Sequence, residues 1–107
     1  MRITHSPWGL VEGHATIAEG IDFVSTASHG GYVISDHRRA QMPASIREIK
    51  TFAGGNNYEE DCDWALVVLA YPYEFPAGVV RHAINMQSHF KLPDSALCAA
   101  RACLSGA

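Results

Sequence analysis

A histidine followed by two glycines, at residues 29–31, is one of two short segments in this sequence whose residue types could do chemistry. Consecutive glycines tolerate positive φ and let the backbone approach a ligand closely, so N–H groups beside His29 could point at an anion. The imidazole titrates near neutral pH and is a common general base and metal ligand. The alternative is structural, with Gly30 and Gly31 forming a tight hairpin turn that His29 caps.

The second segment, residues 58–64, carries four carboxylates within five positions: Glu59, Glu60, Asp61 and Asp63. With a histidine, such carboxylates could hold Mg²⁺, Mn²⁺ or Zn²⁺, or supply an acid–base pair. Two other interpretations stay open. The acids could complement the positive end of a helix dipole, or they could form a negative patch that binds a basic partner. On a helix, Glu59 and Asp63 would share one face.

The first third of the chain is expected to form a small antiparallel β-meander within residues 10–35. Residues 10–18 and 21–25 alternate between apolar and polar side chains across a short glycine-containing turn, which is typical of a hairpin. A third short strand is expected at residues 32–34, after a turn at Gly30 and Gly31. This meander would supply the turn that carries His29.

The rest of the chain is expected to be mainly helical. Ser35 can cap a short helix through residue 41, residues 45–52 are expected to form a loop leading into a short strand, and residues 53–57 form a glycine-rich loop. A helix is then expected to start at Asn57, with Trp64 buried at the head of its apolar stripe. Further helices are expected over residues 76–90 and from Pro93 onward. The sequence therefore predicts a single α+β domain over residues 1–107, a meander followed by C-terminal helices.

Other potential ligands are expected to be structural. Cys62, Cys98 and Cys103 form no CxxC pair and give an odd count, so we expect free thiols and a reduced, cytoplasmic location. His82 and His89 lie seven residues apart on one expected helix and lack the i, i+4 spacing of helical zinc sites. Both histidines are expected to be at the surface or half-buried.

Composition excludes several classes of function. A hydrophobic share of 48%, a charged share of 18% and a net charge of −3 are typical of a globular domain. Only eight residues are basic, which argues against direct nucleic-acid binding. The longest apolar run covers residues 65–71, far below the roughly 20 residues that span a bilayer. We therefore expect no membrane association.

Several strings, taken in order, resemble a family of domains of unknown function. They are Pro7-Trp8-Gly9, residues 25–31 (STASHGG), Pro43 and residues 58–65 (YEEDCDWA). The resemblance covers about residues 6–85 and implies an origin in phage, plasmid or other mobile bacterial DNA. It implies no activity. Family members carry a tyrosine- and tryptophan-containing helix end, whereas this chain has an alanine-rich stretch over residues 96–107.

Two functions follow as expectations. The first is a non-enzymatic accessory protein of a mobile element that binds a host protein or nucleoprotein complex, in the manner of anti-CRISPR inhibitors and without a cofactor. Its partner-binding residues would be His29, Glu59, Glu60, Asp61 and Asp63. The alternative is a small metal-dependent enzyme or metal-binding domain that uses His29 with Glu59, Glu60 or Asp61. The two functions differ in whether they need the His29 turn and the acidic segment to meet in space.

Overall fold

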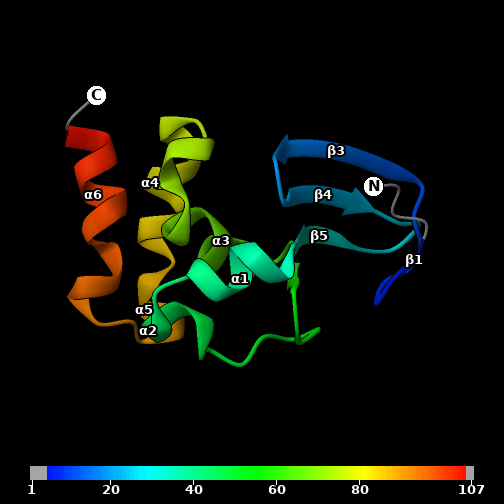
Figure 1. Ribbon diagram of the computed structural model, residues 1–107, viewed down its shortest axis with the longest axis horizontal. Coiled ribbons are helices and arrows are strands. Elements are labelled where there is room, and N and C mark those ends of the chain that lie inside the picture. Colours follow the sequence, from blue (N-terminus) through cyan, green and yellow to red (C-terminus); the bar gives the residue numbers. More distant parts are fainter. Residues whose placement is uncertain (1–4, 106–107) are drawn as a thin grey trace.

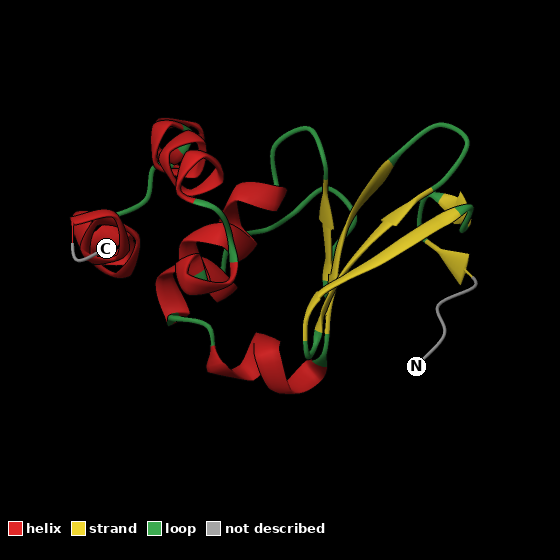
Figure 2. Cartoon of the chain, turned by 90° about the horizontal axis from the view of Figure 1, so that it is seen from above, coloured by secondary structure: helices red, strands yellow, loops and turns green. Residues whose placement is uncertain are grey.

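The computed structural model describes residues 5–105 and has an α+β architecture, in which antiparallel strands precede the helices (Figure 1). The predicted fold class is confirmed. Helices gather on one side of the molecule and the strands on the other (Figure 2). The two ends of the predicted domain, residues 1–4 and 106–107, lie outside the described residues.

Four strands form one antiparallel sheet in the order β3-β4-β5-β6. Their bounds are Gly13–Ala18, Ile21–Ser25, Gly30–Ile34 and Asn57–Glu59. A separate two-stranded hairpin, β1 (His5–Ser6) with β2 (Gly9–Leu10), precedes the sheet. The meander expected within residues 10–35 is confirmed, although its first long strand begins only at Gly13.

The glycine pair lies inside β5 and not in a turn, which corrects the sequence prediction. The turn is instead made by residues 26–29, where the Thr26 hydroxyl donates to the His29 carbonyl at 2.7 Å and accepts from the His29 N–H at 3.1 Å. Gly30 and Gly31 are buried between strands. A Cβ at Gly31 would lie 3.0 Å from Glu59 Cα and 2.8 Å from Trp8 Cη2. The glycines are required by this close approach of β5 to its neighbours.

The expected helix start at Asn57 is also wrong, because residues 57–59 form strand β6. Tyr58 pairs with Tyr32 across the sheet and is 1% exposed, so pairing with β5 buries a large aromatic side chain that a helix start would not. Helix α3 (Trp64–Ala70) begins only after a turn at residues 60–63. Glu59 and Asp63 therefore do not share a helix face.

The short helix after the meander is confirmed as α1 (Asp36–Gln41), in which the Ser35 hydroxyl accepts a hydrogen bond from the Arg38 N–H. Residues 45–52, expected to run as a loop into a strand, instead begin with helix α2 (Ala44–Arg47). The reason is packing, because a helical turn places Ile46 in the core, where it is fully buried. No strand lies between α2 and β6.

The C-terminal helices largely follow the sequence prediction. The helix expected over residues 76–90 is two helices, α4 (Ala77–Asn85) and α5 (Gln87–Phe90), separated at Met86. A 3₁₀ helix, η1 (Pro72–Glu74), precedes them and another, η2 (Asp94–Leu97), leads into α6 (Cys98–Ser105). Met86 is the C-cap of α4, and its N–H donates to two carbonyl groups of that helix, so α4 ends there.

The core is centred on α3, of which residues 65–69 are all buried. A helix buried all round must be covered on every face, and here β5, β6, α4 and α6 contact it. Trp64, predicted to be buried, is half-buried at the edge of this core, with its ring centroid 4.9 Å from that of His82. None of the helices in residues 5–105 is long and apolar enough to cross a membrane.

Candidate metal centre

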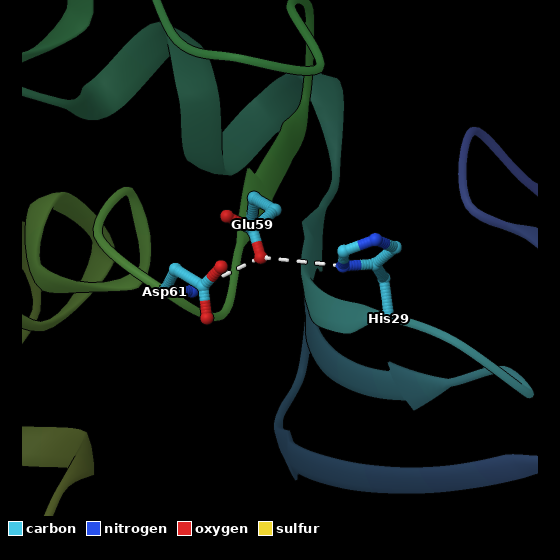
Figure 3. Close-up of side chains that lie close together, drawn as sticks. All are labelled: His29, Glu59 and Asp61. Carbon is cyan, nitrogen blue, oxygen red and sulfur yellow. Dashed lines mark hydrogen bonds and ion pairs between the residues drawn. The ribbon is translucent and has the colours of Figure 1, made fainter.

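His29 ends the turn between β4 and β5, and its ring projects toward the end of β6 (Figure 3). The hydrogen bonds of the Thr26 turn fix the backbone of His29, while about half of its side chain (52%) stays exposed. Its Nδ1 lies 4.0 Å from Oε1 of Glu59. The backbone of His29 is therefore fixed, while its imidazole ring is about half exposed to solvent.

Glu59 is the buried member of the group, with an exposed fraction of only 7%. It is the last residue of β6 and stands opposite Gly31, so the glycine pair that follows His29 also sets the position of Glu59. Its Oε1 accepts a hydrogen bond from the Asp61 N–H at 3.1 Å. A buried carboxylate is costly unless a donor or a cation compensates its charge.

Asp61 completes the group from the turn between β6 and α3, and its carboxylate is exposed beside Glu59 (Figure 3). One ligand atom from each of His29, Glu59 and Asp61 lies within 4.8 Å of the others. Two ligands of a tetrahedral zinc ion stand about 3.4 Å apart, given metal–ligand distances of about 2.1 Å. Small rotations of the exposed His29 and Asp61 side chains would close this difference. We call these three residues the metal centre.

The other two predicted site residues, Glu60 and Asp63, are not part of this three-residue cluster. Glu60 extends the pairing of β5 and β6 through its N–H, which donates to the Gly30 carbonyl at 2.9 Å, and its side chain lines a different cavity. Asp63 is 6% exposed, and its Oδ2 accepts a hydrogen bond from the Phe52 N–H at 2.7 Å. Asp63 thus holds the loop before β6 in place, and it lines the same cavity as His29, Glu59 and Asp61.

A cavity of ≈ 610 Å³ opens beside the metal centre. Besides the three ligand candidates, its lining includes Lys50 and Phe52 from the loop after α2, and His89 and Phe90 from α5. Lys50 was not predicted to be a site residue, and His89 was expected to be a surface or half-buried histidine. No local pattern marks either residue, because they reach the cavity only through tertiary packing.

Cys62 also lines this cavity, between two acidic neighbours. Burial raises the pKa of its thiol, and the negative charges of Asp63, Asp61 and Glu59 raise it further. The thiolate is the nucleophilic form of cysteine, so a raised pKa leaves Cys62 protonated at neutral pH.

One known protein family matches most of the sequence. The model of a family described as "Domain of unknown function (DUF7007)" matches residues 1–101. No curated protein and no solved structure matches the chain. The match covers both segments that make the metal centre and the first half of α6. The expected membership of a family of domains of unknown function is confirmed, and the chain belongs to the DUF7007 family.

Proposed function

We propose that this protein is a metal-binding domain in which His29, Glu59 and Asp61 hold one divalent transition-metal ion, with Zn²⁺ the best candidate. The observation that carries the proposal is the placement of the Glu59 carboxylate, buried between the imidazole of His29 and the turn that carries Asp61. A bound cation would compensate this buried charge. One nitrogen and two carboxylate oxygens suit zinc, and Mn²⁺ is the next choice for the same donor set.

The number of ligands indicates the class of chemistry. Structural zinc sites are closed by four protein ligands, whereas catalytic sites use three and leave one position for water or substrate. Three ligands beside a cavity of ≈ 610 Å³ fit the second arrangement. A zinc ion in such a site acts as a Lewis acid and activates a water for hydrolysis. Lys50 and His89, which line the same cavity, would contribute a positive charge and a proton-transfer group toward a bound substrate.

The test is metal binding by tag-free protein, measured by elemental analysis and by isothermal titration with Zn²⁺. We expect one ion per chain. Glu59→Gln keeps the size of the side chain and removes its charge, and should weaken zinc binding at least ~100-fold, since even outer-shell changes cost about 10–100-fold. His29→Ala should cause a comparable loss. His37→Ala, which removes an exposed histidine on α1, is the matched control and should bind like the wild type.

A second candidate function is a non-enzymatic accessory protein of a phage or other mobile element that binds a host defence complex in the cytoplasm. The specific observation in its favour is Phe52, a large aromatic side chain that is 84% exposed beside the acidic cavity. Exposed aromatic residues are enriched where proteins meet their partners, and acidic neighbours steer basic partner surfaces. Asp61 and His29 lie at the same cavity and would take part in this contact.

The two candidates respond differently to substitution. Phe52→Ala leaves the metal ligands in place, so it should abolish association with a purified host defence complex while zinc binding stays at the wild-type level. Asp61→Asn should also weaken that association and reduce its salt dependence. If no complex in a panel of purified defence complexes binds the wild-type protein, the second candidate fails and the metal-binding proposal is unaffected.

A further inference from the structure

A second cavity, of ≈ 490 Å³, adjoins the metal centre at Asp61, which lines both cavities. Three aromatic side chains from three different elements line it: Phe23 of β4, Tyr32 of β5 and Trp64 at the start of α3. Aromatic rings that meet at an accessible cavity, instead of being buried in the core, present their faces or edges to a ligand. This aromatic cavity has no role in the metal-binding proposal.

Edge-to-face contacts hold the rings of Phe23 and Tyr32 in fixed orientations. Phe23 and Tyr32 are register partners on β4 and β5, and their rings meet edge to face with centroids 5.6 Å apart. Tyr32 makes a second edge-to-face contact with Phe75, at 5.5 Å. Burial raises the pKa of Tyr32, so its ring stays neutral at physiological pH. The aromatic cavity is thus pre-formed.

Two carboxylates give the aromatic cavity a negative charge. Glu60 and Asp61 line it from the turn between β6 and α3, and both residues are exposed. The cavity therefore combines π-faces, which attract cations through the ring quadrupole, with negative charges that pair with a cation. The chain already contains such a contact elsewhere, where the guanidinium of Arg38 lies over the Tyr71 ring, 4.7 Å from its centroid.

We propose that the aromatic cavity binds the cationic side chain of a partner protein, an arginine guanidinium in preference to a lysine ammonium. A planar guanidinium can stack on a ring and donate to two carboxylate groups at once, which a compact ammonium does less well. His82 also lines the cavity, and its imidazole meets the Trp64 ring in a tilted contact, with centroids 4.9 Å apart and 58° between the ring planes. The metal centre is not needed for this binding.

The test uses metal-free wild-type protein in EDTA and a short peptide with one central arginine. Binding is followed by NMR through the indole signal of Trp64, one of the two tryptophans in the chain. We expect the chemical shift of this signal to change with peptide concentration until it reaches saturation. A peptide with citrulline, the neutral isostere of arginine, should bind at least ~10-fold more weakly. Glu60→Gln should weaken arginine-peptide binding about 3–10-fold. The exposed Glu48→Gln, outside the cavity, is the matched control and should have no effect.

Three results would overturn the proposal. The first is an unchanged Trp64 signal at millimolar arginine peptide. The second is equal binding of the arginine and citrulline peptides, which would mean that the aromatic cavity selects for shape and not for charge. The third is tighter binding of agmatine, the same guanidinium without a peptide backbone, which would identify a small amine as the ligand instead of a partner protein. Because the protein is metal-free throughout, none of these results bears on zinc binding.

Discussion

Replacing Gly31 by alanine should destabilise the protein and separate β6 from β5. The added Cβ would stand 2.8 Å from Trp8 Cη2, 3.0 Å from Glu59 Cα and closer still to the carbonyl oxygen of Tyr58. Carbon atoms in ordinary contact are about 3.5–4.0 Å apart. The contacts at Tyr58 and Glu59 are with backbone atoms, which cannot turn aside as a side chain can, so β6 must move by roughly 1 Å. This movement acts on the strand pair that positions Glu59.

The magnitude follows from two contributions. Overpacking a well-packed site costs about 1–3 kcal/mol, and each weakened backbone hydrogen bond between β5 and β6 adds about 0.5–1.5 kcal/mol. We expect Gly31→Ala to lower the free energy of unfolding by about 2–4 kcal/mol, which corresponds to a fall of roughly 1–2 M in the urea midpoint. Zinc affinity should fall as well, because the Glu59 carboxylate moves away from His29.

Urea denaturation followed by circular dichroism measures the effect, with Gly78→Ala as the matched control. Gly78 lies in α4, and a Cβ there would meet only Arg81 Nη2, at 3.8 Å. Because alanine favours a helix over glycine by up to about 1 kcal/mol, this control should be neutral or stabilising. If Gly31→Ala unfolds at the same urea concentration as the wild type, the close approach of β5 and β6 is not what requires the glycine, and our reasoning is wrong.

Three further predictions concern the neighbouring segment and the thiols. Asp63→Ala removes the acceptor of the Phe52 N–H and should lower the free energy of unfolding by about 1–3 kcal/mol while zinc affinity stays unchanged; a loss of zinc binding in a folded variant would make Asp63 a ligand. Iodoacetamide should alkylate Cys62 more slowly than it alkylates glutathione at pH 8, as measured by peptide mapping. The rate should rise only at higher pH, because the raised pKa of Cys62 keeps the thiolate scarce until then. Equal rates at pH 8 would contradict the pKa shift. Thiol counting in denaturant without reductant should find three thiols per chain, and a lower count in fresh protein would show a disulfide.

Local sequence signals predicted those elements whose structure is determined locally. The Ser35 cap and the alternation of residues 21–25 identified α1 and β4, because capping and side-chain periodicity depend on near neighbours. Strand β6 was not predicted, because its structure depends on residues far away in the sequence. Asn57 followed by acids is a good local signal for a helix start, but pairing with β5, more than 20 residues earlier, buries Tyr58 and outweighs it.

Part of the candidate site could be predicted from the sequence. His29 and the acidic segment stand out by residue type, and the structure brings His29 together with Glu59 and Asp61. The sequence could not separate these acids from Asp63, whose carboxylate is used by the backbone of a loop eleven residues away. Nor could it place Lys50 at the cavity, because that contact depends on how the loop after α2 packs. Which carboxylate is free and which is engaged is decided by tertiary structure.

The most direct test of the metal centre is a titration of tag-free protein, ¹⁵N-labelled at histidine, with Zn²⁺. We expect the NMR signals of the His29 ring nitrogens to shift and reach saturation at one equivalent, while those of His14 and His37 do not move. In Glu59→Gln the His29 signals should stay at their metal-free positions at the same zinc concentration. If the His29 signals do not respond at one equivalent, or if the response appears at His82 or His89 instead, His29 is not a zinc ligand.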